Sequence, residues 1–154
     1  MKNLSQDDLI DYIKPILKTQ GFKKKGKRWI KTLDDFTLVF YIQGSIYDKE
    51  TYYIRPGVFM NYCPKEPLFS YGHFQTEITS TDPQGILSEA ERFFSEWCNK
   101  DLIRRRVKEF IEWEKRNPVE KRRAGLVDYE KDPVPSGVCF SIEENVIDYI
   151  INCL

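Results

Sequence analysis

Apolar residues near the start of the chain recur at the spacing of one helix face. Ser5 followed by Asp8 resembles a capping box that opens a helix, and Gly21 is a typical C-terminal stop. Pro15 lies well inside the run and has no backbone N–H, so we expect it to kink or divide the helix. The spacing predicts an N-terminal amphipathic helix whose inward positions are Leu9, Ile10, Ile13, Ile16 and Leu17.

After Gly21 the pattern changes to that of extended strands. Strands are predicted at residues 22–31, 36–43 and 51–60, and residues 73–79 can add a fourth. The connections after the first two strands are short enough for hairpins, which predicts an antiparallel sheet. The strand at 36–43 is apolar at nearly every position, so we expect it to be central and covered on both faces.

Two of these strands carry residues that are typical of sheet edges. The first is basic outside Phe22, Trp29 and Ile30, which suits an edge strand facing solvent. The third contains Pro56 and Gly57, and proline cannot donate to a ladder of hydrogen bonds. We therefore expect the third strand to lie locally at an edge or a bulge.

The rest of the chain is predicted to be mainly helical. Asp82 and Pro83 are typical of a helix start, and a broad apolar stripe from Ile86 to Cys98 must pack on the sheet. A second helix is expected over residues 101–116, an extended loop over 132–137, and a last helix capped by Ser141 with Glu144. The prediction is an α+β fold with an N-terminal helix, an antiparallel sheet of about four strands, and C-terminal helices packed on it.

Length and composition are consistent with one folded domain over residues 1–154. Residues 1–80 would form the first helix and the sheet, and residues 81–154 the helical portion. Of the 154 residues, 41% are hydrophobic and 31% are charged, which is typical of a globular protein. The sequence has no secretory signal and no apolar run of the ~18 residues that a membrane span requires. We expect a cytoplasmic protein that does not bind membranes.

The four cysteines are widely spaced and form no CxxC pair. A chain of this length can bury a core without cross-links, and the missing signal favours a reducing compartment. Free thiols are therefore favoured over disulfides for Cys63, Cys98, Cys139 and Cys153.

Charge is balanced overall but divided into blocks. The chain has 24 Lys and Arg against 24 Asp and Glu, which argues against a generally basic nucleic-acid binder. Residues 21–31, however, hold six basic side chains and no acid, and residues 100–123 hold ten basic and five acidic ones. Residues 77–99 and 124–154 are correspondingly acidic. We expect a surface with two signs of charge, which can steer a protein partner.

No catalytic or metal-binding motif is present. His73 is the single histidine, and the sequence shows no partner that would make it a general base or a zinc ligand. GxSxG, GxGxxG and GxxxxGK[ST] patterns are absent as well. The sequence therefore predicts no catalytic residue, no metal ligand and no cofactor, although Mg²⁺ held by carboxylates has no fixed spacing and stays open.

Part of the N-terminal half resembles a known family. The carrying segments are residues 12–18, Gly21 to Gly26 of the "GFKKKG" turn, the aromatic Trp29, residues 42–45 (Ile-Gln-Gly-Ser) and residues 52–58. They are similar to the bacterial family catalogued as domain of unknown function 4304, convincingly over residues 8–60 and more loosely to about residue 98. The family has no established activity. Some members resemble immunity partners of secreted toxins in size and gene setting.

Candidate binding residues come from the basic strand and from the family motifs: Lys23, Lys24, Lys25, Arg28, Trp29, Gln43, Ser45 and Arg55. In one interpretation the basic strand follows a nucleic-acid backbone while aromatic rings stack on bases. In the favoured interpretation its lysines protect an edge strand against pairing with another chain. Arg104, Arg105 and Arg106 splay around a helix and cannot form one flat patch.

Three functions remain open at this point. The favoured one is a non-enzymatic protein-interaction module, in particular an immunity-type inhibitor of a toxin, with the acidic C-terminal third contacting a basic toxin surface. The alternative is a module that binds RNA or a nucleotide through the basic strand from Lys23 to Trp29. The third is a metal-dependent hydrolase that uses carboxylates. The missing catalytic motif favours a role without enzymatic activity.

Overall fold

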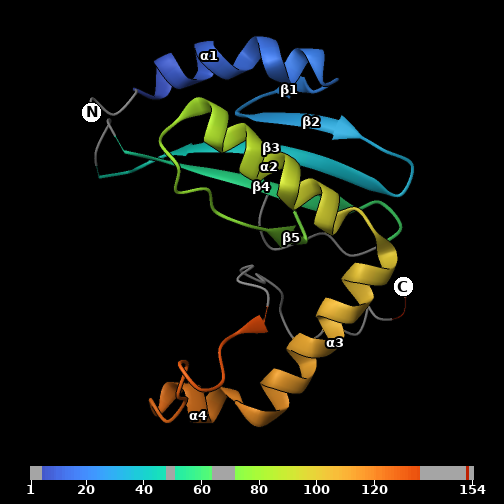
Figure 1. Ribbon diagram of the computed structural model, residues 1–154, viewed down its shortest axis with the longest axis vertical. Coiled ribbons are helices and arrows are strands. Elements are labelled where there is room, and N and C mark those ends of the chain that lie inside the picture. Colours follow the sequence, from blue (N-terminus) through green and yellow to red (C-terminus); the bar gives the residue numbers. More distant parts are fainter. Residues whose placement is uncertain (1–4, 48–50, 64–71, 136–151, 153–154) are drawn as a thin grey trace.

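The computed structural model describes residues 5–47, 51–63, 72–135 and 152. Figure 1 shows a sheet with two helices against it and two further helices that lead away from it. The elements in chain order are α1 (Gln6–Thr19), β1 (Lys23–Lys25), β2 (Arg28–Thr32), β3 (Phe36–Gly44), β4 (Tyr52–Met60), β5 (Phe74–Gln75), α2 (Pro83–Trp97), α3 (Lys100–Arg116) and α4 (Val119–Arg123). This architecture confirms the predicted α+β fold. The predicted last helix, Cys139 and Cys153 lie outside the described residues.

The sheet is antiparallel and has its five strands in the order β1-β2-β3-β4-β5. The sheet has one strand more than the four expected, because the predicted strand 22–31 is a hairpin of two strands. Gly26, at a φ of 64°, forms the turn between β1 and β2. A left-handed backbone is least costly at glycine. The turn was not predicted, because the lysines on both sides of Gly26 read as one continuous basic strand. β1 is exposed at the sheet edge, as the sequence predicted.

The prediction that the third strand lies at an edge was wrong. β4 lies between β3 and β5, and it pairs with β3 along its whole length. Pro56 is tolerated because its missing donor faces the weakly paired side of the strand. There its carbonyl accepts from Thr76 at 3.0 Å, while regular β5 pairing ends at Gln75 and resumes only as a bridge between Ile54 and Ile78. β5 is therefore shorter than the strand expected at residues 73–79.

α1 is one continuous helix despite Pro15, so the expected division does not occur. Ser5 caps it as predicted, and its side chain accepts a hydrogen bond from the Asp8 amide at 3.2 Å. Leu9, Ile13 and Leu17 are buried, while Pro15 lies on the exposed side. Packing of the apolar face outweighs the backbone hydrogen bond that Pro15 cannot make.

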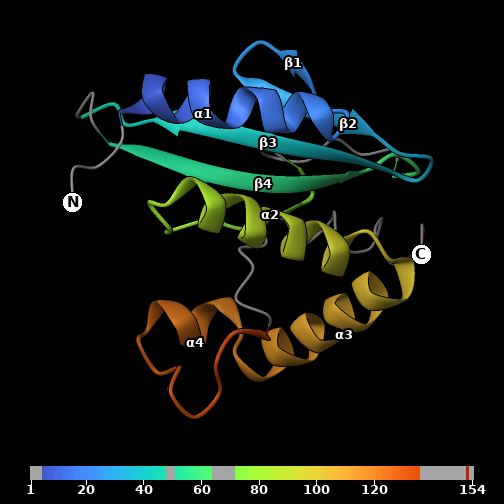
Figure 2. The same ribbon diagram turned by 45° about the horizontal axis from the view of Figure 1, so that its top comes forward.

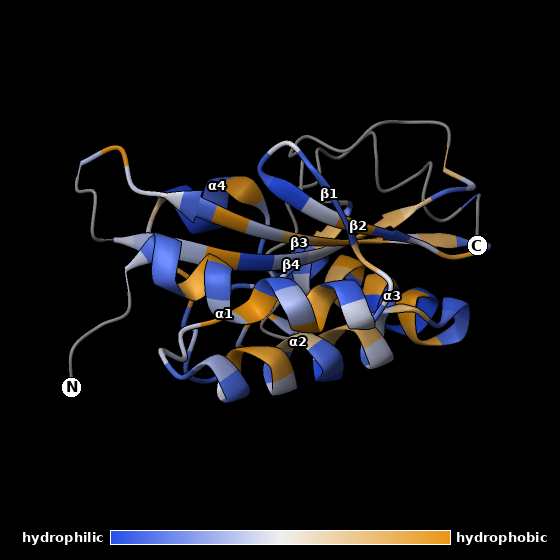
Figure 3. Cartoon of the chain, turned by 90° about the horizontal axis from the view of Figure 1, so that it is seen from above, coloured by the Kyte–Doolittle hydropathy of each residue, from blue (hydrophilic) through white to orange (hydrophobic). Residues whose placement is uncertain are grey.

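α2 covers the same face of the sheet as α1. Asp82 caps the helix, with its carboxylate accepting from the Gly85 amide at 3.0 Å, and Pro83 begins it. Figure 3 shows the two helices side by side along one side of the sheet. The ring of Phe22, which follows α1, lies 5.9 Å from the ring of Phe94 in α2. The core between helices and sheet includes the alternating residues of β3, namely Phe36, Leu38, Phe40 and Ile42.

α3 and α4 lead away from the sheet, and α4 lies farthest from α1 (Figures 1 and 2). Ile103 and Val107 of α3 belong to the main core. Trp113 is buried outside that core, stacked near Phe110 and Tyr129. Arg106 lies over the Trp97 ring and pairs with Glu96 of α2 at 3.6 Å. The far half of α3 therefore has a small aromatic cluster of its own.

Candidate functional site

A cavity of about 500 Å³ opens at the end of the sheet where α1 begins. Three segments meet there: the start of α1, the β1–β2 turn, and the last residues of β3 with the loop that follows. Its volume is within the range of small-molecule sites in proteins. The cavity is lined by Gln6, Ile10, Lys24, Gly26, Lys27, Trp29, Tyr41, Ile42, Gln43, Gly44, Ser45 and Ile46.

The unequal lengths of the strands create this cavity. The last pair between β2 and β3 joins Arg28 to Tyr41, because the chain turns back at Gly26. β3 continues to Gly44 with β4 as its only neighbour in the described ladder. The start of α1 closes the space, since a Cβ placed on Gly44 would lie 3.2 Å from Gln6 Oε1. The short basic hairpin thus leaves room that a longer one would fill.

Strand alternation decides which lysines reach the cavity. Lys24 pairs with Trp29, whose side chain is in the core, so both lie on the helix side of the sheet. The Lys24 ammonium nitrogen is 6.0 Å from the centre of the Trp29 ring. Lys27 lines the cavity from the turn, whereas Lys23 and Lys25 do not line it.

The lysines of the β1–β2 hairpin are exposed. No ion pair with a described residue involves the four of them, which are Lys23, Lys24, Lys25 and Lys27. Two ion pairs do join a basic block to an acidic one elsewhere, namely Arg106–Glu96 at 3.6 Å and Arg116–Asp132 at 2.9 Å. The hairpin therefore offers positive charge to an anionic partner or ligand, while the first turn of α1 at the same end carries Asp7 and Asp8.

Gln43 leaves a buried polar atom without a partner beside the cavity. Its Oε1 is buried and accepts no hydrogen bond from any residue that the structure describes. A buried amide oxygen without a donor is unfavourable by roughly 1–3 kcal/mol, and it is a site where a bound group can supply the missing hydrogen. Ser45 lies next to it, and its hydroxyl oxygen accepts from the Tyr47 amide at 3.1 Å.

The loop after β3 exposes two large apolar side chains, of which Ile46 lines the cavity and Tyr47 follows it in the chain. Ile46 is 87% exposed and Tyr47 is 92% exposed. We call these two residues the loop tip. Apolar side chains that stand this far out of the surface, next to unneutralised lysines, are typical of a contact region for another molecule.

The structure brings half of the predicted binding residues together. Lys24, Trp29, Gln43 and Ser45 line the cavity, although the Trp29 ring is only 3% exposed and lies in the core. Lys23 and Lys25 belong to the same hairpin but not to the lining. Arg28 and Arg55 lie in one row with Tyr41 on the opposite face of the sheet, and Arg55 pairs with Glu77 at 3.5 Å.

The sequence analysis missed the remaining lining residues. Lys27 was within the basic block, but nothing in the sequence indicated that the turn would direct it to the cavity. Gln6 was recognised only as part of a helix start, and the apolar loop tip was not singled out. A signal for the loop tip was present, because Ile46 and Tyr47 are large apolar residues within a predicted hairpin connection.

His73 and the described cysteines have structural surroundings. His73 is buried, its Nδ1 accepts from the Met60 amide at 3.1 Å, and its ring lies 5.9 Å from that of Phe59. Cys63 and Cys98 are free thiols, and burial raises the pKa of Cys98 to about 11. Within the described ranges, no three His, Cys, Asp or Glu side chains come together as a metal site. None of the helices described is long and apolar enough to cross a bilayer.

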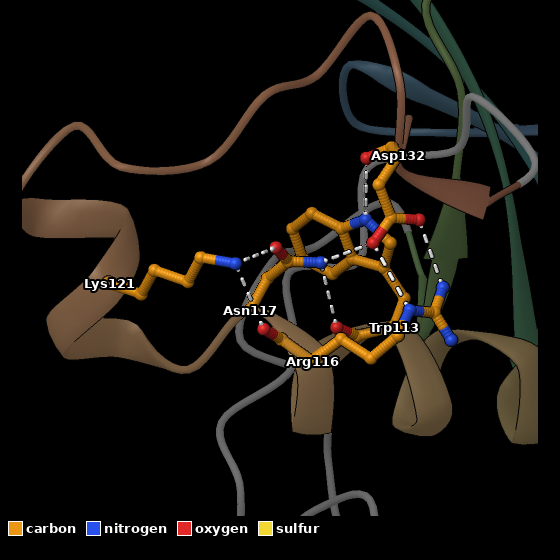
Figure 4. A network of polar contacts seen from close by, with 5 residues as sticks. All are labelled: Trp113, Arg116, Asn117, Lys121 and Asp132. Carbon is orange, nitrogen blue, oxygen red and sulfur yellow. Dashed lines mark hydrogen bonds and ion pairs between the residues drawn. The ribbon is translucent and has the colours of Figure 1, made fainter.

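A second polar cluster joins the end of α3 to the segment after α4 (Figure 4). Arg116 donates two hydrogen bonds to the Asp132 carboxylate, at 3.1 and 2.9 Å, and the Asn117 amide donates a third at 2.8 Å. The Trp113 indole N–H donates to the Asp132 carbonyl at 2.9 Å. These contacts hold the pKa of Asp132 below its usual value, with the Arg116 hydrogen bonds as the largest cause. Because these contacts hold the segment after α4 against the end of α3, we assign the cluster a structural role.

Comparison with known proteins adds a family but no activity. No curated protein and no solved structure matches the chain. A family match, in contrast, extends over residues 13–154, and it includes the Arg-rich helix and the C-terminal segment, which the motifs quoted above did not reach. The chain therefore belongs to the family described as Domain of unknown function (DUF4304).

Proposed function

We propose that this chain is a non-enzymatic protein-interaction module, and that its partner binds at the end of the sheet that carries the loop tip. The observation that supports this most directly is the exposure of Ile46 and Tyr47, at 87% and 92%, beside the basic hairpin. A tyrosine and a branched aliphatic side chain are the kind of anchor found at the centre of protein interfaces.

Charge provides the second argument. Lys24 and Lys27 of the β1–β2 hairpin line the same cavity as Ile46, and lysines without an ion-pair partner among the described residues attract an acidic surface over several ångströms. Burial of the loop tip would then supply affinity, while the lysines set the rate and orientation of docking. We infer a partner whose contact surface is acidic at its rim and has an apolar pocket at its centre. This differs from the basic toxin surface expected opposite the acidic C-terminal third, most of which lies outside the described residues.

The specific form that we favour is an immunity-type inhibitor that blocks a toxin. An inhibitor of this type needs a stable fold and a contact surface, and it needs no catalytic group of its own. Co-expression with a toxin encoded beside it in the native host would restore growth, and Tyr47→Ser would abolish the rescue. If no neighbouring gene encoded a toxin and no rescue occurred, this form of the proposal would be rejected while the interaction module could still be tested.

Site-specific photo-crosslinking in the native host tests the interaction surface. A photoreactive residue at position 47 is compared with one at position 126, because Leu126 is also a highly exposed apolar residue but follows α4. We expect one protein to be crosslinked from position 47 and not from 126. With the purified partner, Tyr47→Ser should weaken binding about tenfold or more, and Leu126→Ser should not. Equal crosslinking from both positions, or unchanged affinity for Tyr47→Ser, would contradict the proposal.

Binding of RNA through the basic strand is the second candidate, and the unneutralised lysines support it. The mode of binding would differ from the one expected from the sequence, because the Trp29 ring is in the core and cannot stack on bases. Contact would be limited to phosphates, so affinity should fall steeply with salt and disappear when Lys23, Lys24 and Lys25 are replaced by glutamate. Absent or salt-insensitive binding to single-stranded RNA would exclude it.

A further inference from the structure

We propose that the cavity beside α1 binds a nucleoside monophosphate, a small molecule with one phosphate and a flat heterocyclic body. This proposal shares Ile46 and the hairpin lysines with the protein-interaction surface, but it concerns a small ligand and is tested without a protein partner. Three features support it: the volume and walls of the cavity, the lysines that line it, and the unpartnered oxygen of Gln43.

The lysines indicate the anionic group. Lys24 lines the cavity from β1 and Lys27 from the β1–β2 turn, and neither pairs with a carboxylate among the described residues. A lysine ammonium binds phosphate as a point charge with three donors. Ser45 adds a hydroxyl group to the same lining. Together these groups can hold a phosphate at the mouth, where its remaining oxygens stay hydrated.

The walls indicate an organic body in addition to the phosphate. At about 500 Å³ the cavity is much larger than one phosphate, and Ile10 and Ile46 add apolar surface to a mainly polar lining. A nucleobase has two apolar faces and N–H donors on its edge. Alternation along β3 places Gln43 with Tyr41 on the face opposite Ile42, and both line the cavity where β2 no longer covers the edge of β3. A base that reaches round this open edge can donate to the unpartnered Gln43 Oε1. A sugar phosphate has no flat apolar face to lie against Ile10 and Ile46, and so fits less well.

The geometry also provides a matched control. Lys23 and Lys25 lie on the same three-residue strand as Lys24, but strand alternation directs them away from the cavity lining. Replacing Lys24 and Lys27 by glutamine removes two positive charges, and replacing Lys23 and Lys25 removes the same two charges from the same hairpin. All four side chains are exposed, so neither double variant is expected to unfold. Any difference between them reports position, because net charge is equal.

The experiment is a calorimetric and NMR titration of the full chain with the 5′-monophosphates of adenosine, guanosine, cytidine and uridine. Inorganic phosphate, adenosine and glucose 6-phosphate are the comparison probes. We expect at least one nucleotide to bind with Kd below ~1 mM, and about tenfold more tightly than phosphate or the free nucleoside. Lys24→Gln with Lys27→Gln should weaken it about tenfold, and Lys23→Gln with Lys25→Gln less than about twofold.

Gln43→Leu tests the buried oxygen separately. It removes the amide without changing charge, and it should weaken the nucleotide while leaving the weak binding of inorganic phosphate unchanged. Thermal melts of all variants check the fold. The proposal is overturned if no nucleotide binds, if inorganic phosphate or glucose 6-phosphate binds as tightly as the best nucleotide, or if the two double variants lose the same affinity. None of these outcomes affects the crosslinking test of the interaction surface.

Discussion

Cys98 and Asp132 show how the surroundings of a single side chain set its chemistry. Cys98 lies at the C-terminal end of α2 with its thiol largely removed from water, and that burial disfavours the thiolate. Asp132 lies at the surface, but its carboxylate receives hydrogen bonds from Arg116 and Asn117, and these favour the charged form. Neither shift is visible in the sequence, because each depends on residues brought close by folding.

The raised pKa of Cys98, about 11, predicts that its thiol reacts slowly with alkylating reagents at neutral pH. In a variant where Cys63, Cys139 and Cys153 are serine, alkylation by iodoacetamide near pH 8 should be roughly a hundredfold slower in the native protein than in guanidinium chloride, because the thiolate is the nucleophile. The native rate should continue to rise with pH up to about 11. A native rate that levels off at the pH of an ordinary thiol would contradict this prediction.

The lowered pKa of Asp132 predicts that the protein loses part of its stability in acid. Its pKa in the folded protein is lower than the usual value of 3.8, so the folded state binds the proton less readily than the unfolded state does. The carboxylate therefore stabilises the fold above the usual pKa, and this contribution disappears as the pH falls through the lowered value. In urea unfolding, wild type should be more stable than Asp132→Asn near neutral pH, and the difference should shrink below about pH 4.

A control for this measurement is Asp34→Asn, because Asp34 is exposed in the turn between β2 and β3. A difference between wild type and Asp132→Asn that stays constant from neutral to acidic pH would show that the Arg116 contact has no influence on titration.

At the scale of elements, close approach of backbones fixes the β5 edge of the sheet. Gly72 precedes β5 at a φ of 133°, and a Cβ placed on it would lie 2.7 Å from both the amide nitrogen and the carbonyl oxygen of Val58. His73 then donates its amide to that same carbonyl at 2.9 Å. Only glycine allows the chain to pass β4 at this distance and then pair with it.

Gly72→Ala should therefore destabilise the protein far more than Gly26→Ala. Both glycines have positive φ, but a Cβ on Gly26 meets nothing within 4 Å. We expect a loss of about 1 kcal/mol for Gly26→Ala, from backbone strain alone, and about 3 kcal/mol or more for Gly72→Ala, from strain plus the clash with Val58. Urea unfolding of both variants measures this, and equal losses would show that β5 can move away from β4 without cost.

At the scale of the whole molecule, two aromatic clusters stabilise different regions. Trp97 lies in the main core, stacked on Phe74 with ring centres 4.8 Å apart. Trp113 lies in the outer cluster, between Phe110, Tyr129 and the guanidinium of Arg122. The sheet end that carries the cavity belongs to the first region, so changes in the outer cluster should leave the cavity intact.

Hydrogen exchange with matched tryptophan variants tests this separation. Trp97→Ala should cost about 3–5 kcal/mol and increase exchange throughout β3, β4 and α2, because it opens a hole in the shared core. Trp113→Ala should increase exchange over the second half of α3 and residues 119–135, with β3 and β4 unchanged. Faster exchange in the sheet of Trp113→Ala would show instead that both regions unfold as one unit.

Some features of this fold could be predicted because their causes are local. Ser5 and Asp82 begin helices as expected, since a cap needs only the amides of the next few residues. The apolar stripe of α2 and the alternation in β3 are equally local. The division of the first strand at Gly26 and the interior position of Pro56 were not predicted, because each depends on which strand becomes the neighbour.

The candidate site shows the same limit. Its residues Lys24, Trp29, Gln43 and Ser45 were selected from a basic run and family motifs, and the sequence could not separate Lys24 from Lys23 and Lys25. That distinction depends on the register between β1 and β2, which places Lys24 opposite the buried Trp29. Gln6 joins the site only because packing of α1 brings it to Gly44.

The sequence by itself determined the kinds of element, their order, the balanced but divided charge and the family, because periodicity, caps and composition act within a few residues. Tertiary structure alone decided that a short hairpin leaves a cavity beside α1, that two of its lysines line that cavity, and that the Gln43 oxygen is buried without a donor. Those properties arise from strand register and helix packing, which join residues far apart in the chain, and so no local pattern contains them.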